Sequence, residues 1–300
     1  MHETKKLNWF LKLRITIDDV GIHMDQSNYV KQIIEKYDEK FSLKTRKPRD
    51  TPHDYNVTLD KDGRVSNKDT AEKSPILTAK NKTLYREIIG ELLHLVKYTR
   101  MDLMPSTHTA SRFNNLPTQK HLRSLVNTLT YVKTHPNIPL TFYWGDDPTL
   151  ITYSDSDFAT CRDTRRSISS HIIFSGKTPI YWYCKRQRTP AYSTCEAEYM
   201  AMADLTRSII YFRQLYTELG YEQKPTIMYV DNQPAIAVSK EPRCYKRTKH
   251  IAICYHITRN QVVRGNITPV YIASELNLAD FLTEPMSVKV FQRLLKTIYA

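Results

Sequence analysis

The order of apolar segments in residues 148–285 is the feature that most restricts the possible fold. Three segments of strand length follow one another at about residues 150–158, 168–175 and 178–185, and a hairpin-sized turn, Ser175-Gly176-Lys177, separates the last two. The pattern then predicts, in order, a long helix from Ser193 to Leu219, a strand at Thr226–Val230, a short helix from Asn232, a helix at about 247–264, a strand at Ile267–Ile272 and a short helix at Glu275–Leu282. This order predicts an α/β fold with a five-stranded mixed sheet and flanking helices.

The segments before residue 148 predict a smaller, mainly helical region. Residues 1–40 contain a β-hairpin and a helix that runs to about Asp38. Residues 41–83 are polar, charged and interrupted by prolines, which predicts a linker. Residues 84–147 predict three helices and one strand, and residues 286–300 a C-terminal helix.

The composition excludes several classes of protein. Lysine and arginine number 44 against 31 aspartate and glutamate, and both halves share the resulting charge of +13. A positive charge spread in this way is typical of a protein that binds a polyanion, although an ordinary basic surface has the same composition. Five cysteines without a CxxC pair argue against a disulfide framework or a zinc knuckle, and favour a reducing intracellular setting. We find no apolar run of membrane-spanning length, no secretory signal after Met1 and no glycine-rich phosphate loop.

Four acidic residues lie in or beside the apolar segments of the second half. They are Asp155 inside the first strand, Glu198 early in the long helix, Asp231 directly after the fourth strand and Asp280 near the start of the last helix. A carboxylate inside a buried strand is unfavourable unless it binds a cation or a hydrogen-bond donor. Four converging carboxylates would supply the oxygen ligands that Mg²⁺ prefers, and two ions about 3.5–4 Å apart would suit phosphodiester hydrolysis. Two other roles stay open: Asp231 could cap the next helix, and Asp280 could be an ordinary first-turn acid.

Five segments of the second half form a more specific pattern. They are Tyr153-Ser-Asp-Ser-Asp-Phe-Ala159 with Arg165-Arg166-Ser167, Ser193-Thr-Cys-Glu-Ala-Glu-Tyr-Met-Ala201, Val230-Asp-Asn-Gln-Pro-Ala-Ile236, Arg247-Thr-Lys-His-Ile251 and Leu278-Ala-Asp-Phe-Leu-Thr283. In this order they resemble the ribonuclease H domain of copia-type retrotransposon Pol polyproteins. The first half, through segments such as Leu84-Tyr-Arg-Glu-Ile-Ile-Gly90 and Thr99-Arg-Met-Asp102, is similar to the end of the reverse transcriptase palm, the thumb and the connection of the same polyproteins.

The resemblance implies a fold, a cofactor and a reaction. It implies a ribonuclease H-like sheet whose metal ligands are Asp155, Glu198, Asp231 and Asp280, with Mg²⁺ or alternatively Mn²⁺ as the cofactor. The implied reaction is endonucleolytic hydrolysis of the RNA strand of an RNA–DNA hybrid, which leaves 3′-hydroxyl and 5′-phosphate ends. Reverse transcription is not expected, because the family carries its palm carboxylates upstream of the matching segments.

A non-catalytic nucleic-acid-binding remnant is the alternative. Departures from the family pattern favour it, such as Glu284 where the family usually has lysine. The resemblance also implies association with other Pol segments, no membrane partner, and an intracellular location in a cytoplasmic particle or the nucleus.

Two further acids, Glu196 and Asp157, lie close in the sequence to the four candidate ligands. Ser193-Thr-Cys-Glu196 is a capping-box pattern, so Glu196 is expected to bond back to the cap residue. Glu198 lies roughly 200° further around the helix and is free to face another surface. Asp157 shares the strand face of Asp155, and we expect an edge residue there, with an outer carboxylate of the metal site as the alternative.

Seven basic residues are candidates for contacts with nucleic-acid phosphates. They follow the first and third strands or precede a helix: Arg165, Arg166, Lys185, Arg186, Arg188, Arg247 and Lys249. Cationic side chains at these places would position a duplex through its phosphates, whereas solvated surface charge is the alternative.

Overall fold

The computed structural model describes residues 8–55, 59–64, 73–161, 163–240 and 252–299, without the side chains of residues 252–255. The chain divides into two compact units: residues 1–145 with 285–300 form unit 1, and residues 146–284 form unit 2. The C-terminal helix therefore belongs with the first part of the chain. Within the described segments, no helix has the length and apolarity needed to cross a membrane.

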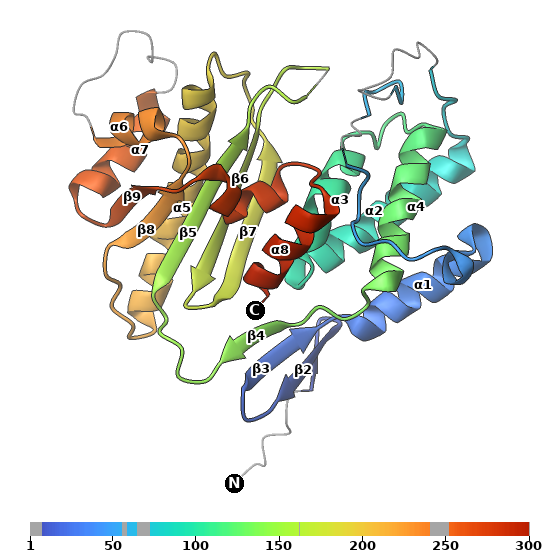
Figure 1. The fold of residues 1–300 in the computed structure, drawn as a ribbon, viewed down its shortest axis with the longest axis horizontal. Helices are drawn as coiled ribbons and strands as arrows, with labels where there is room; N and C mark the ends of the chain where they lie inside the picture. The colour runs from blue at the N-terminus through green and yellow to red at the C-terminus, as the bar shows by residue number, and fades with distance from the viewer. Residues whose placement is uncertain (1–7, 56–58, 65–72, 162, 241–251, 300) are drawn as a thin grey trace. The chain divides into compact units, whose positions relative to one another are not determined.

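Unit 1 combines a small antiparallel sheet with helices (Figure 1). Its strands are β1 (Trp9–Phe10), β2 (Leu13–Ile17), β3 (Gly21–Asp25) and β4 (Leu140–Tyr143), hydrogen-bonded in that order. Its helices are α1 (Ser27–Phe41), α2 (Ala79–Tyr98), α3 (Met104–Ser111), α4 (Gln119–Thr134) and α8 (Val288–Ile298), with the 3-10 turns η1 (Leu43–Thr45) and η2 (Met101–Leu103). The predicted hairpin is present, while the pairing of β3 with β4 is a long-range contact that no local pattern indicates.

The segment predicted as a polar linker contributes to the packing of unit 1. Leu43, His53 and Leu77 are buried, and α2 begins at Ala79, before the predicted start of the helical region at residue 84. Phe291 of α8 packs edge-on against His53, with ring centroids 5.9 Å apart. The described part of residues 41–83 is therefore tied to the core of unit 1 at a few buried positions.

Unit 2 contains the five-stranded mixed sheet that the element order predicts (Figure 1). Its strands are β5 (Leu150–Asp157), β6 (Ile168–Ser175), β7 (Thr178–Arg186), β8 (Thr226–Val230) and β9 (Ile267–Tyr271). The order across the sheet is β7-β6-β5-β8-β9, with β5, β6 and β7 antiparallel and β8 and β9 parallel to β5. The fold class predicted for this half, an α/β fold with a five-stranded mixed sheet and flanking helices, is confirmed.

The helices of unit 2 follow the predicted order, with different bounds near the end. They are α5 (Thr194–Glu218), α6 (Gln233–Lys240) and α7 (Ala252–Val263), followed by the 3-10 turns η4 (Ser274–Leu276) and η5 (Leu278–Leu282). The last predicted helix is thus a pair of tight turns. The predicted helix start at residue 247 lies outside the described residues.

Helix α5 is held on the sheet by one apolar face. Tyr199, Met202 and Leu205 recur at helical spacing, are fully buried, and form one cluster with Ile173 and Met228 of the sheet. This packing fixes the rotation of α5 about its axis. It therefore also fixes the direction of Glu198, which precedes Tyr199 on the same helix.

Candidate metal centre

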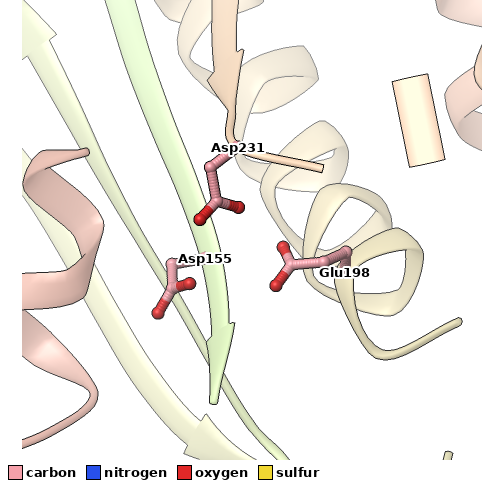
Figure 2. A group of neighbouring side chains, drawn as sticks. All are labelled: Asp155, Glu198 and Asp231. Atoms are coloured by element: carbon pink, nitrogen blue, oxygen red, sulfur yellow. The ribbon is translucent and has the colours of Figure 1, made fainter. Parts of the chain in front are cut away.

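Three of the four predicted acids converge at one edge of the sheet. Asp155, Glu198 and Asp231 each offer a carboxylate oxygen, and these three atoms lie within 4.8 Å of one another. Figure 2 shows the carboxylates facing a common space from β5, from the first part of α5 and from the end of β8. The structure therefore brings three of the four predicted acids together from distant segments, and their role as metal ligands stays a prediction.

The register of two parallel strands places Asp155 beside Asp231. Strand β5 pairs with β8 up to Ser154 and Val230, so each acid is the next residue after the last matched pair. The carboxyl ends of parallel strands are where side chains of open α/β sheets gather around a ligand. The two aspartates are neighbours because the backbones of β5 and β8 are hydrogen-bonded to each other just before them.

The start of α5 brings Glu198 to the same edge. Ser193 caps the helix, since its hydroxyl accepts a hydrogen bond from the Glu196 backbone N–H at 3.2 Å. The Glu196 carboxylate accepts from the backbone N–H of Tyr192 at 2.8 Å, so the predicted bond to the cap residue itself is wrong by one position. The separation of Glu196 from the site is confirmed, and Glu198 is buried.

Asp231 is not the cap of the following helix. That role belongs to Asn232, whose side-chain oxygen accepts a hydrogen bond from the backbone N–H of Ala235 at 2.9 Å. Asp231 Oδ2 instead accepts a hydrogen bond from the hydroxyl of Ser274 at 2.6 Å. The alternative of a capping role for Asp231 is therefore excluded by the geometry.

The fourth acid, Asp280, lies close to the triad but outside the group of three mutually close oxygens. It sits in η5, where Asn277 accepts from the backbone N–H of Ala279 and donates to the Ser154 carbonyl oxygen of β5 at 3.0 Å. The Ser170 hydroxyl of β6 donates to the Ala279 carbonyl oxygen at 2.9 Å. These bonds fix the segment of Asp280 along the sheet. Its role as a ligand of a second ion stays a prediction.

Burial and neighbouring negative charges raise the pKa of Asp155, Glu198 and Asp280. Burial raises the pKa of Asp155 to about 7, with the Asp231 and Asp157 charges adding to the shift and a hydrogen bond from Thr283 opposing it. Burial, followed by the charges of Asp155 and Asp231, raises the pKa of Glu198 well above its usual range. The same causes, again led by burial, raise the pKa of Asp280 to about 10. A group of carboxylates in this condition is stabilised by a bound cation.

Among the described residues, two buried carboxylate oxygens without a hydrogen-bond partner also indicate that the site suits a cation. Glu198 Oε2 and Asp280 Oδ1 are buried and have no hydrogen-bond partner among the described residues. Buried polar atoms are usually paired, so such atoms in an acidic group call for a cation or a donor. The hard oxygen donors present here fit Mg²⁺ or Mn²⁺.

Asp157 is the last residue of β5, two positions after Asp155. Its side chain is half-buried at the end of β5, and its charge acts on Asp155 by raising the pKa of that carboxyl. Both interpretations, the edge residue that we expected and an outer carboxylate of the metal site, stay predictions.

Sequence reasoning missed the hydroxyl groups around the triad. Each of the three carboxylates accepts a hydrogen bond from the hydroxyl group of a serine or threonine: Asp155 from Thr283, Glu198 from Ser156 and Asp231 from Ser274. Ser156 and Thr283 stand inside the quoted motifs, beside the acids, and this adjacency was the available signal. Ser274 lies outside those motifs, and no local signal marks it.

The candidate nucleic-acid contacts lie in two described places. Arg165, Lys185 and Arg188 are exposed, and Arg166 and Arg186 are half-buried. Arg186 Nη1 lies 3.6 Å from Cys161 Sγ, which ties the end of β7 to the loop after β5. Arg247 and Lys249 lie outside the described residues. These assignments stay predictions.

Comparison with known proteins gives matches along nearly the whole chain. The chain is 32% identical over 289 residues to the retrovirus-related Pol polyprotein from transposon RE1 of Arabidopsis thaliana, covering 96% of this chain and 19% of that protein. It is 31% identical over 297 residues to the retrovirus-related Pol polyprotein from transposon RE2 of the same plant, covering 99% of this chain and 19% of that protein. The chain thus spans about a fifth of the length of these curated relatives.

Two other comparisons complete the findings. No family model matches the chain. Among solved structures, LC11-RNase H1 in complex with an RNA/DNA hybrid covers 44% of this chain and 92% of its own, at 17% identity and a TM-score of 0.33.

Proposed function

Because this chain belongs to the copia-type retrotransposon Pol polyprotein family, we propose that unit 2 is a ribonuclease H-type nuclease. Its substrate is the RNA strand of an RNA–DNA hybrid, and its products carry 3′-hydroxyl and 5′-phosphate ends. The observation that carries the proposal is the convergence of Asp155, Glu198 and Asp231 within 4.8 Å at the carboxyl ends of β5 and β8.

The chain's own residues have distinct parts in this proposal. Asp155, Glu198 and Asp231 hold the divalent cations, and Asp280 completes a second ion site from the adjacent turn. Two bound Mg²⁺ or Mn²⁺ ions would supply an activated water and stabilise the leaving oxygen of a phosphodiester. The buried surroundings of Asp155 and Glu198 exclude bulk water from their side of the site, which strengthens their attraction for a cation.

Exposed cations near the ends of β5 and β7 would hold the substrate. Lys185 lies in the last residues of β7, Arg188 follows the end of that strand, and Arg165 lies in the loop between β5 and β6. Contacts from these side chains to phosphates position a duplex without reading its sequence, which suits a nuclease that acts on hybrids generally. Association with the remaining segments of a Pol polyprotein forms part of the same proposal.

Cleavage of a labelled RNA–DNA hybrid by the full chain tests this function. We expect Mg²⁺-dependent cleavage by the wild type and none by Asp231→Asn, which keeps the shape of the side chain and removes its charge. Glu196→Gln is the matched control, because Glu196 is an acid of α5 that bonds Tyr192 instead of facing the triad. That control should cleave at the wild-type rate.

Two results would contradict the proposal. Unchanged cleavage by Asp231→Asn would show that the triad does not perform the reaction. Hybrid binding that weakens steeply with salt, without cleavage in Mg²⁺ or Mn²⁺, would instead support a non-catalytic nucleic-acid-binding remnant.

A further inference from the structure

Each carboxylate of the triad has one oxygen bound by a hydroxyl group. The distances are 2.8 Å from Thr283 Oγ1 to Asp155 Oδ2, 2.9 Å from Ser156 Oγ to Glu198 Oε1, and 2.6 Å from Ser274 Oγ to Asp231 Oδ2. In every pair the donor and the acid lie at least 42 positions apart in the sequence. The repetition of one arrangement at all three acids is the starting observation.

The hydrogen bonds from the hydroxyls make the two oxygens of each carboxylate different from one another. In each carboxylate, one named oxygen accepts the hydroxyl. For Glu198 the difference is complete, because Oε1 accepts from both the hydroxyl and the backbone N–H of Ser156, whereas Oε2 is buried with no partner among the described residues. Free rotation of the carboxylate would exchange these oxygens, and the hydrogen bonds prevent it.

We propose that Thr283, Ser156 and Ser274 are positioning residues that fix the rotation of the three carboxylates for divalent-cation binding. This inference rests on the proposed function, because it assigns the hydroxyls to the same metal site. Three close carboxylates repel one another, so without these donors their side chains would turn apart when no cation is bound. Hydrogen-bonded partners of metal ligands typically contribute about 10–100-fold to metal affinity.

The burial and the additional hydrogen bonds of the three residues predict which hydroxyl has the largest effect on cation binding. Thr283 and Ser156 are buried, whereas Ser274 is exposed, so water can replace the Ser274 hydroxyl more easily. Ser156 also donates through its backbone N–H, and this bond survives removal of the hydroxyl. Thr283 is therefore expected to have the largest effect. Its hydroxyl also lies 3.2 Å from the Asp280 carbonyl oxygen, which connects Asp155 to the turn of the fourth acid.

Titration calorimetry of the full chain with Mn²⁺ and Mg²⁺ tests this inference without measuring cleavage. Thr283→Val removes the hydroxyl and keeps the shape, and should weaken cation binding by about 10-fold or more. Thr283→Ser restores a hydroxyl and should bind within about 2-fold of the wild type. Thr217→Val is the control, because its hydroxyl bonds the Arg213 carbonyl oxygen of α5 and lies away from the triad; its affinity should not change.

Cleavage at varied Mg²⁺ gives a second readout that a merely structural role would not move. Thr283→Val should cleave poorly at low Mg²⁺ and approach the wild-type rate at saturating Mg²⁺. Ser274→Ala, at an exposed position, should show a smaller shift of the same kind. Equal cation affinity in the wild type and in all three hydroxyl variants would overturn the inference.

The outcomes also separate this inference from the proposed function. If the wild type binds no cation that Asp231→Asn loses, the metal site itself fails. If the wild type binds through the triad while Thr283→Val, Ser156→Ala and Ser274→Ala bind equally well, the metal site stands and the positioning role fails.

Discussion

Asn277 donates a hydrogen bond from Nδ2 to the Ser154 carbonyl oxygen at 3.0 Å, and this bond fastens the turn of Asp280 to strand β5. The Asn277 side chain is fully buried and also accepts from the Ala279 backbone N–H at 3.2 Å. A single amide thus joins the last motif of the site to the first. It does so on the backbone immediately before Asp155.

Removing this amide should loosen the turn. Asn277→Ala leaves the Ser154 carbonyl oxygen without its side-chain partner and should lower the free energy of unfolding by about 1–3 kcal/mol. Urea denaturation of the full chain measures the change. Asn266→Ala is the control, because Asn266 is half-buried and bonds the side chain of Gln261. Equal stabilities of the two variants would contradict an anchoring role for Asn277.

Neutralising Glu198 should stabilise the protein when no metal is present. Its pKa is raised above the unfolded value, so the folded state increasingly loses stability as pH rises above the usual range of a glutamate. Glu198→Gln removes this cost, keeps an acceptor for Ser156, and should gain about 1–2 kcal/mol at pH 8 in EDTA, with loss of cleavage. Thermal denaturation in EDTA measures the gain in metal-free stability. Thermal denaturation in Mg²⁺ measures the loss of cation binding, since added Mg²⁺ should stabilise only the wild type. A less stable Glu198→Gln variant in EDTA would contradict the repulsion described here.

Acid should loosen the C-terminal segment of unit 1 through His53. Its Nε2 accepts a hydrogen bond from the Met286 backbone N–H at 3.0 Å, which requires a neutral ring. Burial lowers the pKa of His53 to about 4, with Asp54 opposing the shift and Arg49 adding to it. Because the folded pKa lies below the unfolded value near 6.5, the contribution is complete above pH 6.5 and is lost as pH falls toward 4.

The size of this pH effect follows from the shift. Between pH 7 and pH 5 the free energy of unfolding should fall by about 2 kcal/mol through His53 alone. Urea denaturation at the two pH values measures the fall, and His53→Gln should reduce it by that amount whatever its stability at pH 7. An undiminished fall in His53→Gln would assign the acid sensitivity to other groups.

A buried ion pair should be essential to unit 1. Arg100 and Asp102 are fully buried, with Arg100 Nη2 and Asp102 Oδ2 2.8 Å apart, and the Tyr131 hydroxyl donates to the same Asp102 oxygen. Asp102→Ala leaves the buried Arg100 guanidinium without its carboxylate partner, and should lower the free energy of unfolding by about 3–5 kcal/mol. Arg207→Ala, which breaks an exposed pair with Asp204, should cost under about 1 kcal/mol in the same denaturation measurement. Similar losses for the two variants would contradict the importance of burial.

The sequence supports the fold of unit 2 more fully than that of unit 1. Strand periodicity and the Ser193 cap are local signals, so the five strands and α5 can be predicted closely. The pairing of β4 with β3 and the packing of Phe291 on His53 depend on contacts between distant segments. Such contacts follow from tertiary packing, which composition and periodicity do not encode.

The candidate metal centre, too, can be predicted only in part from the sequence. Acids at the ends of apolar elements are visible in the sequence, and the motif order identifies Asp155, Glu198 and Asp231 among their neighbours. Their hydroxyl partners are not visible as such, because a serine at position 274 has the same sequence signature as any loop serine. The long reach of Thr283 to Asp155 becomes evident only when η5 is placed beside β5.

A crystal structure of the full chain with Mn²⁺, read by anomalous scattering, tests the metal site most directly. The account predicts a manganese peak at direct coordination distance from carboxylate oxygens of Asp155, Glu198 and Asp231. The same crystals of Asp231→Asn should lose that peak. Saturating Mn²⁺ with no peak among these three side chains, or any one of them turned away from the other two, would contradict it.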